Sequence, residues 1–461
     1  MNLHGPVRVA DAASAGTATI SLSFDAWKEV RVAATTHSVT VLPPKPAPKT
    51  EPVAPNLVAT LVHPEKKAGT GHLEFSKDGK RLFVSGYPSG IVQIWDVASR
   101  KEWRRFETPP GLRATNRYAL LAPDWKTLYV PVERRAVRTI ERDGKKVYRF
   151  DYSGEIRVWD IASGKEKDPL RPPLGWAPLY WGSVTPGSRF LVCSEVSSYD
   201  TFEKEINVAT ILWDLQTGKR TKLSEGMMPP LIAPDGKTAY FGHSVSDPKT
   251  GTWKSDVRIL ELPSGNEIAK VSCPRNDVAF AVWAISPDEQ VIAVYVGDLT
   301  GPAKEFCFFD TQTLAPRGKL VDQNSSPKSG MNTGVFTSDG KRFITVDATA
   351  HALVWDIAQQ KLIRKVPIGR DEAPWSFAIS PDGATLAFTW MPKSDPSLAN
   401  VLQPDPHDLP QPRISLIDLS GNAPPRILIA PHGYVGSVAF SPDGKTLAFG
   451  SSGAVHLFDL R

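Results

Sequence analysis

Cysteine is scarce in this chain, and its spacing excludes two kinds of stabilising site. The 461 residues include 3 cysteines, which are Cys193, Cys273 and Cys307. They form no CxxC pair, no Cys/His cluster and no even-numbered framework, so the sequence predicts neither a zinc site nor a disulfide scaffold. We expect free thiols buried in strands, because unpaired cysteine packs as a small apolar residue.

Long apolar runs are also missing. No run approaches the roughly 20 residues that cross a bilayer, so no transmembrane segment is expected. The N-terminus lacks the basic start and apolar stretch of a signal peptide. That absence favours the cytoplasm, unless the chain is a fragment of a longer exported protein, and the compartment stays open. The net charge of +5 argues against a dedicated nucleic-acid binder.

Known catalytic patterns are absent as well. The sequence has no GxSxG elbow, no HExxH and no P-loop. Its 9 histidines are scattered without metal-ligand spacing. We therefore predict no catalytic residue, no metal and no cofactor, and expect a protein that is not an enzyme.

Turn-forming residues, by contrast, are abundant and periodic. The 41 prolines and 34 glycines favour many turns over long helices. A Ser, Ala or Thr followed by Pro-Asp-Gly or a near variant recurs along the chain. These turns begin at Ser76, Ala122, Thr185, Ala233, Ser286, Thr337, Ser380 and Ser441. Proline pre-sets φ, and Asp and Gly tolerate the later positions, so each is a tight turn between strands.

A second signal follows each turn. An alternating strand lies before the turn and another after it, and a third strand ends in an aromatic or aliphatic residue followed by an acid. The acids are Asp96, Asp160, Asp214, Glu261, Asp310, Asp356, Asp418 and Asp459, and Trp precedes the first three and Asp356. A fourth strand follows most of them. Repeated units of four short antiparallel strands predict an all-β, eight-bladed β-propeller.

These residues resemble the WD-repeat propeller family, in a degenerate form of bacterial type, from about residue 55 to the end of the chain. The resemblance implies a protein-binding scaffold but not its partner. The family's Gly-His pair survives only at Gly71-His72. The family's buried Asp–His–Ser/Thr–Trp hydrogen-bond network is therefore expected to be missing from most blades, which packing must hold instead.

The two ends of the chain indicate how the ring closes. Only Leu460 and Arg461 follow Asp459, so the eighth repeat lacks a fourth strand. Residues 57–62 form a strand with no repeat of its own, and adding it to the last blade removes an exposed edge. The propeller is thus predicted over residues 55–461. Residues 44–54 are a proline-rich, semi-rigid linker. Residues 1–43 are a short β-rich fragment, a partial β-sandwich-like segment with too few strands to bury a core.

Insertions between the second and third strands of repeats two, three, four and seven are expected on one rim of the ring, with the Pro-Asp-Gly turns on the opposite side. Loops on a rigid scaffold commonly carry binding. The residues chosen as partner contacts on these insertions are Arg134, Arg138, Arg142, Lys145, Arg149, Tyr199, Trp253, Trp390 and His407.

The repeat-two insertion makes the sharpest prediction. Asp143-Gly144 is a strong signal for a two-residue hairpin turn. An unbroken register from this turn places Arg138 opposite Arg149 and forms a long arm. One face of the arm then carries the five basic candidates, Arg134 to Arg149. The other carries Val137, Tyr148, Phe150 and Tyr152.

Two interpretations of the basic face remain open. It either receives an acidic partner or is neutralised by the neighbouring insertion, which holds Glu195, Asp200, Glu203 and Glu205. The leading hypothesis for the whole chain is a non-enzymatic, monomeric scaffold that binds a protein or peptide on the insertion-bearing rim. The alternatives are an enzyme or small-ligand sensor that uses the central channel, or a structural spacer in a cell-envelope protein.

Overall fold

The computed structural model divides the chain into two compact units, Met1–Val53 and Ala54–Arg461. In the first unit, β1 (Gly16–Thr19) pairs antiparallel with β2 (Ser38–Val41). The structure describes residues 16–19, 38–41, 56–64, 69–87, 90–109, 112–114, 119–142, 145–200, 206–225, 230–246, 253–273, 279–297, 303–321, 331–347, 351–367, 373–391, 413–419, 425–430 and 436–461. The sandwich-like segment and the linker expected before residue 55 stay predictions.

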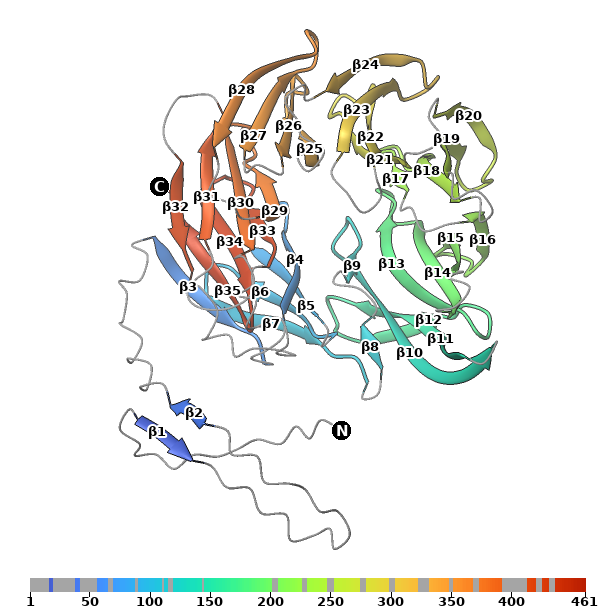
Figure 1. Cartoon of the computed structure of the whole chain (residues 1–461), viewed down its shortest axis with the longest axis horizontal. Helices are drawn as coiled ribbons and strands as arrows, with labels where there is room; N and C mark the ends of the chain where they lie inside the picture. The colour runs from blue at the N-terminus through green and yellow to red at the C-terminus, as the bar shows by residue number, and fades with distance from the viewer. Residues whose placement is uncertain are drawn as a thin grey trace, which may run out of the picture. The chain divides into compact units, whose positions relative to one another are not determined.

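The second unit is a ring of antiparallel blades (Figure 1). Blade 1 consists of β4 (Gly69–Phe75), β5 (Arg81–Tyr87), β6 (Val92–Asp96) and β7 (Lys101–Phe106). Blade 2 consists of β9 (Leu120–Leu121), β10 (Thr127–Arg142), β11 (Lys145–Asp160) and β12 (Glu166–Leu170), with β8 (Arg113–Ala114) beside β10. Blade 3 consists of β13 (Ala177–Val184), β14 (Phe190–Asp200), β15 (Ile206–Asp214) and β16 (Arg220–Glu225). Blade 4 consists of β17 (Leu231–Ile232), β18 (Thr238–Ser246), β19 (Trp253–Glu261) and β20 (Glu267–Ser272).

The other half of the ring repeats the same order. Blade 5 consists of β21 (Ala279–Ile285), β22 (Val291–Gly297), β23 (Ala303–Asp310) and β24 (Pro316–Val321). Blade 6 consists of β25 (Met331–Phe336), β26 (Arg342–Asp347), β27 (His351–Asp356) and β28 (Lys361–Pro367). Blade 7 consists of β29 (Ala373–Ile379), β30 (Thr385–Met391), β31 (Arg413–Asp418) and β32 (Arg426–Ile429). Blade 8 consists of β33 (Val438–Phe440), β34 (Thr446–Ser451), β35 (Ala454–Asp459) and β3 (Leu57–Val62). The predicted eight-bladed propeller is confirmed, and every third strand ends at the predicted acid.

The predicted closing strand is also confirmed. β3 pairs antiparallel with β35, with Leu57 opposite Phe458 and Val62 opposite Ala454. Asn56 continues the junction, since its side-chain amide donates to the carbonyl oxygen of Asp459 at 2.7 Å. The first described strand of the propeller thus completes the blade that contains its last strand.

The hydrophobic core lies between neighbouring blades. Large side chains of one blade interleave with those of the next, as where Phe306 of blade 5 meets Phe343 of blade 6 in an edge-on contact with ring centroids 5.1 Å apart. Phe308 packs on Phe343 in the same way at 5.5 Å. Burial of such rings dominates core energetics, so each blade is stabilised chiefly by its two neighbours.

The Pro-Asp-Gly turns contact one another from blade to blade. A Cβ placed on the turn glycine Gly444 would lie 3.7 Å from Cδ of Pro381 in the preceding turn, and one on Gly340 would lie 3.7 Å from Pro287. The junction between blades 8 and 1 has the same contact, because a Cβ placed on Gly79 would lie 3.6 Å from Cδ of Pro442. These turns therefore share one side of the ring, as predicted.

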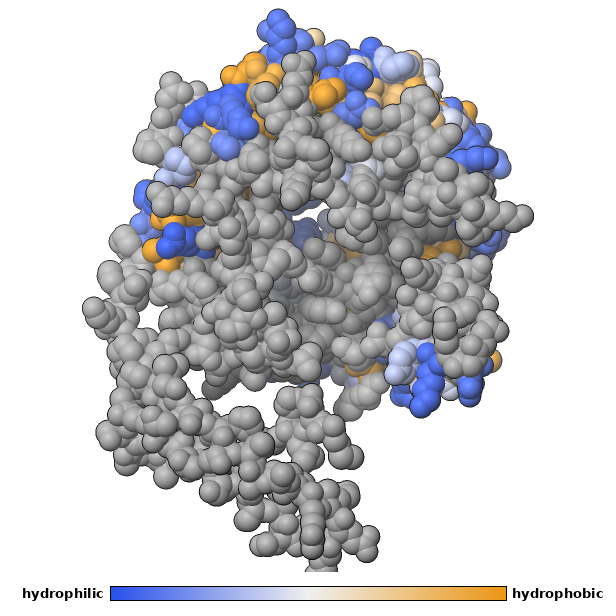
Figure 2. Space-filling model, viewed as in Figure 1, coloured by the Kyte–Doolittle hydropathy of each residue, from blue (hydrophilic) through white to orange (hydrophobic). Residues whose placement is uncertain are grey.

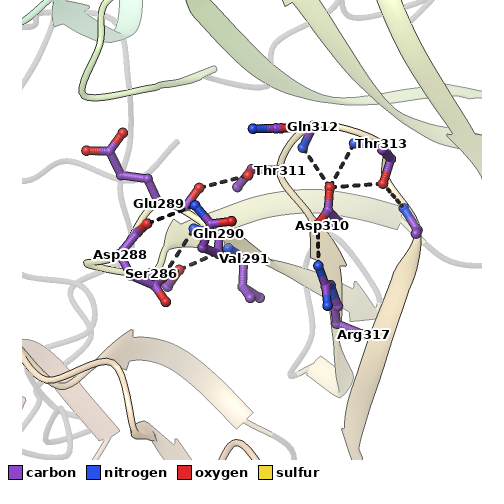
Figure 3. Close-up of polar contacts among 11 residues, drawn as sticks. Ser286, Asp288, Glu289, Gln290, Val291, Asp310, Thr311, Gln312, Thr313 and Arg317 are labelled. Carbon is purple, nitrogen blue, oxygen red and sulfur yellow. Dashed lines mark hydrogen bonds and ion pairs between the residues drawn. The ribbon is translucent and has the colours of Figure 1, made fainter.

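Polar contacts inside the turns were not foreseen from the sequence. In blade 5, the Ser286 hydroxyl donates to Oδ1 of Asp288 at 2.5 Å and accepts from the backbone N–H of Val291 at 3.0 Å. Asp288 also accepts from the backbone N–H of Gln290 at 3.2 Å (Figure 3). These bonds lower the pKa of Asp288, with the Ser286 hydroxyl as the largest cause. Blades 1, 6, 7 and 8 repeat the hydroxyl-to-aspartate bond.

The acids that end the third strands cap the next turn. Asp310 accepts from the backbone N–H groups of Gln312 at 3.0 Å and Thr313 at 2.9 Å, and from Arg317 at 2.6 Å (Figure 3). These bonds, led by that from Arg317, hold the pKa of Asp310 far below its usual value. Thr311 then ties this turn to the other one, donating to the carbonyl oxygen of Glu289 at 2.7 Å. Asp310 is therefore structural, and the side chains of Asp96, Asp160, Asp214 and Asp356 accept from backbone N–H groups in the same way.

Candidate protein-interaction surface

The repeat-two insertion forms the predicted arm. β10 and β11 pair over their full length of 16 residues each, from Thr127 opposite Asp160 to Arg142 opposite Lys145, without a register shift. The inner half belongs to the blade, where Leu128 is fully buried opposite Trp159. The outer half, from Arg134 to Ser153, extends beyond it, and we call this outer half the arm. The register deduced from Asp143-Gly144 is confirmed, while those two turn residues lie outside the described part of the chain.

The basic face of the arm is partly neutralised from within. Arg138 and Arg149 are register partners, as predicted. Arg138 is 71% exposed, and its Nε lies 2.9 Å from Oδ2 of Asp151, two positions along β11 on the same face. Asp151 lies beyond the segment Arg134 to Arg149 from which the basic face was predicted. Arg134, on the same face, is exposed.

The opposite face of the arm exposes apolar side chains. Val137 is 52% exposed and Tyr148 is 53% exposed. They occupy diagonal positions on one face, because Val137 is the partner of Phe150 and Tyr148 is the partner of Thr139. Tyr152, two positions farther along β11, is half-buried. Among the described side chains, one face of the arm thus exposes Arg134 and Arg138, and the other exposes Val137 and Tyr148 beside Glu141 and Lys146.

The neighbouring insertion meets the arm through its backbone. β14 belongs to blade 3, but its last residues pair with β11 and place Asp200 opposite Arg149 and Tyr199 opposite Phe150. Blades 2 and 3 are consequently joined in one nine-stranded sheet. In Figure 1 the two long strands β10 and β11 curve past the end of β14. Of the acids expected to neutralise the arm, Asp200 is a backbone partner of β11.

Glu195 does not serve the arm, which corrects the sequence interpretation. Its side chain is fully buried within blade 3. There it accepts from Nε of Arg220 at 3.0 Å and from Nε1 of Trp213 at 3.1 Å. Trp213 is one of the Trp-Asp tryptophans, and in this blade its indole N–H donates to a carboxylate. Glu203 and Glu205 lie outside the described residues.

One blade retains a hydrogen bond of the kind found in the family network. Trp355 donates from Nε1 to the hydroxyl of Thr345 at 2.9 Å, with both residues buried. In blade 4 the tryptophan is replaced by Leu260. Packing and these few buried polar contacts hold the blades.

The remaining candidates are spread along the ring. Tyr199 lies beside the arm, Trp253 begins β19 opposite Ser246, and Trp390 lies in β30 opposite Pro374. His407 and the rest of the seventh insertion lie outside the described residues. The structure thus brings the basic candidates and Tyr199 together in the backbone but does not join Trp253 or Trp390 to them.

Other surfaces of the ring offer less to a partner. Figure 2 shows hydrophobic side chains near the outer rim by β24 and β28, interspersed with hydrophilic ones. They include Val321, 39% exposed, and Ile363, 49% exposed. Single apolar residues of this kind are normal on a protein surface. Hydrophilic side chains gather where Figure 1 places the arm.

The cysteines match expectation in part. No disulfide joins them, but only Cys193 is buried, while Cys273 after β20 and Cys307 in β23 are half-buried. Burial raises the pKa of the Cys193 thiol well above its usual value. The described part of the chain holds no group of three or more His, Cys, Asp or Glu residues placed to bind a metal ion. It also contains no helix long and apolar enough to cross a membrane.

Comparisons with known proteins agree with this architecture. Residues 424–459 match the family model described as WD domain, G-beta repeat. Among solved structures, the chain is similar to the C-terminal WD40 domain of Sif2, with 12% identity and a TM-score of 0.55 over 88% of this chain and 97% of that one. It is also similar to the computationally designed Ika8 protein, with 12% identity and a TM-score of 0.53 over 87% and 98%. No curated protein matches.

The ring of antiparallel blades defines the class of the protein, an eight-bladed β-propeller. The match to the WD repeat model spans β32 of blade 7 and the three strands β33, β34 and β35 of blade 8, and the fold is similar to that of a WD40 domain. WD40 propellers are commonly protein-interaction scaffolds.

Proposed function

We propose that this protein is a non-enzymatic scaffold that binds an acidic protein or peptide on the rim formed by the insertions of blades 2 and 3. The observation that carries the proposal is the arm, a regular two-stranded extension with a basic face and an exposed apolar face. Val137 and Tyr148 lie together on one face, so a partner that covers both removes adjacent apolar area from water, which favours association.

Rigidity supports a binding role for this surface. The arm continues the register of blade 2 and is braced on one edge by β14 of blade 3. A surface held by two blades loses little conformational entropy when a partner binds, and preorganisation of this kind raises affinity. Arg134 and Arg138 supply the charge that attracts an acidic partner and increases its association rate.

The test is a selection of displayed random peptides on the immobilised protein and on the double variant Arg138→Glu, Arg149→Glu. The proposal expects peptides rich in Asp and Glu from the wild type and loss of that enrichment in the variant. It also expects nearly unchanged melting, because Arg138 is 71% exposed and substitutions at exposed positions usually alter stability by less than about 0.5 kcal/mol.

Lys219→Glu is the matched control. Lys219 is exposed in the turn between β15 and β16, at the end of blade 3 away from the arm. This variant should select the same acidic peptides as the wild type. The proposal fails if the double variant selects the same peptides as the wild type. It also fails if the double variant melts well below both other proteins, which would mean that the charges serve internal neutralisation.

A further inference from the structure

Within the described part of the chain, the arm has an open edge along β10. Among the described residues, β8 pairs with β10 only at Val132 and Glu133, and β9 pairs with it only at Leu128 and Tyr129. From Arg134 to Arg142, β11 is the one described strand that pairs with β10. An edge strand presents a row of backbone N–H and C=O groups that can pair with another chain.

The two faces beside this edge differ in chemistry. Successive residues of a strand point to opposite faces, so Arg134 and Arg138 lie on the basic face of β10. Val137 lies on the apolar face, next to Tyr148 of β11. A strand added at this edge would present alternate residues to arginines and to exposed apolar groups.

The other edge of the arm, along β11, is already paired with a strand, the end of β14. On the β11 side, Asp200 of β14 is the backbone partner of Arg149, and Tyr199 is the backbone partner of Phe150. Within the molecule, therefore, the arm is paired at one edge with a segment in which an aromatic residue and an acid follow each other.

We propose that the open edge of β10 binds an extended peptide by strand addition, and that this peptide alternates acidic with aromatic or aliphatic residues. The inference rests on the proposed function and specifies its partner. Backbone hydrogen bonds supply affinity in this mode of recognition, and the alternate side chains supply specificity. Opposite charges on adjacent strands stabilise the pair, whereas like charges destabilise it.

The same charges disfavour a second copy of the arm as the occupant. Two β10 edges paired with each other would bring the arginines of one copy beside those of the other, and natural proteins use charged edges to prevent such pairing. A peptide with acids at every second position has the opposite effect. The charge pattern of β10 thus selects an acidic strand over self-association.

The probe is a labelled peptide of sequence Glu-Tyr-Glu-Val-Glu-Tyr-Glu, titrated into the whole protein by fluorescence anisotropy. A block peptide of the same composition, Glu-Glu-Glu-Glu-Tyr-Tyr-Val, is the sequence control. We expect the alternating peptide to bind about tenfold more tightly, a difference of about 1.4 kcal/mol. N-methylation of its valine and both tyrosines should abolish binding, because strand addition needs their backbone N–H groups.

Two protein variants locate the site. Arg138→Glu should weaken binding of the alternating peptide by about tenfold or more, while Lys219→Glu should leave it unchanged. Circular dichroism and melting of both variants check that the propeller remains folded. Equal weakening in the two variants would overturn the site on β10.

The outcomes separate this inference from the proposed function. One outcome is that the alternating, block and N-methylated peptides bind equally and that Arg138→Glu abolishes the binding of all three. This outcome would refute strand addition but remain consistent with an acidic partner on the rim. Failure of all these peptides to bind, with acidic peptides still selected by the wild type, would refute this inference alone. Failure of both experiments would refute both proposals.

Discussion

Thr60 and His456 lie 396 positions apart in the chain, yet the Thr60 hydroxyl is 3.1 Å from Nδ1 of the His456 ring. The other ring nitrogen of His456 lies 2.9 Å from the hydroxyl of Ser451 in the adjacent strand. The histidine is buried and joins β3 to the last two strands of the propeller. The ring is therefore closed by a satisfied polar contact as well as by the ladder between β3 and β35.

The closing strand should contribute strongly to stability through its inward face. Leu61 is 3% exposed and packs between blades 8 and 1, whereas its neighbour Val62 is 61% exposed. We expect Leu61→Ala to lower the free energy of unfolding by about 2–5 kcal/mol, and Val62→Ala to change it by less than about 0.5 kcal/mol. Denaturant titration of both variants measures this difference. Similar values for the two would contradict the role of β3.

Acid should weaken the closure before it affects the rest of the ring. Burial lowers the pKa of His456 from 6.5 to about 4. The folded state keeps this ring neutral at pH values where the unfolded chain binds a proton, so stability is full above pH 6.5 and is lost as pH falls toward 4. A shift of this size corresponds to about 3 kcal/mol. Thermal melting between pH 7 and pH 4.5 measures the loss.

His456→Gln isolates this effect. Glutamine can still form hydrogen bonds but does not titrate, so the variant should be less stable at pH 7 and lose less stability on acidification. The carboxylates in the repeated turns, such as Asp288, have lowered pKa values and lose their contribution at lower pH in both proteins. Identical pH profiles for the two proteins would rule out His456 as the source.

Gly154 should fix the base of the arm. A Cβ at this position would lie 2.2 Å from the carbonyl oxygen of Val132, a backbone atom that cannot move aside. Gly154→Ala should therefore destabilise the protein by about 1–3 kcal/mol and increase proteolysis between residues 134 and 153. Ser153→Ala, at the exposed neighbouring position, should leave both unchanged. Equal protease resistance of the two variants would contradict this close approach.

Two ion pairs of β16 should differ greatly in their contribution to stability. Glu195 is fully buried against Arg220, whose side chain is 24% exposed. Glu195→Ala leaves that arginine without its carboxylate and should cost about 3 kcal/mol, the low end for a broken buried pair. Glu225, 80% exposed and 2.8 Å from Lys222, should cost less than about 1 kcal/mol when changed to alanine. Urea titration compares the variants, and equal losses would refute the distinction.

Local signals allowed most of the fold to be predicted. The turn at Asp143-Gly144 fixes which residues face each other on either side of it, and with period-two alternation the register extends to Leu128 and Trp159 without further information. The acid at the end of a third strand marks where that strand stops, because its carboxylate accepts hydrogen bonds from the turn that follows. Both signals act over a few residues and can be recognised in one sequence.

Contacts between blades could not be predicted in the same way. Asp200 and Glu195 occur in one acidic stretch, but the first pairs with the arm and the second is buried with Arg220. Which of them turns inward depends on where β14 leaves blade 3, and that is set by tertiary packing. The turn hydroxyls did have a signal, a Ser or Thr two residues before Asp, whose hydrogen bond to the carboxylate was overlooked.

The sheet that joins blades 2 and 3 changes how the repeats depend on one another. Repeat arrays usually behave as a sum of units with nearest-neighbour terms, but β14 is hydrogen-bonded both to its own blade and to β11. The two blades should therefore open as one cooperative unit in hydrogen exchange. A duplication or deletion of one of these two repeats without the other would interrupt a continuous sheet. The two repeats together are therefore the smallest segment of this region that a genetic rearrangement could move without breaking a sheet.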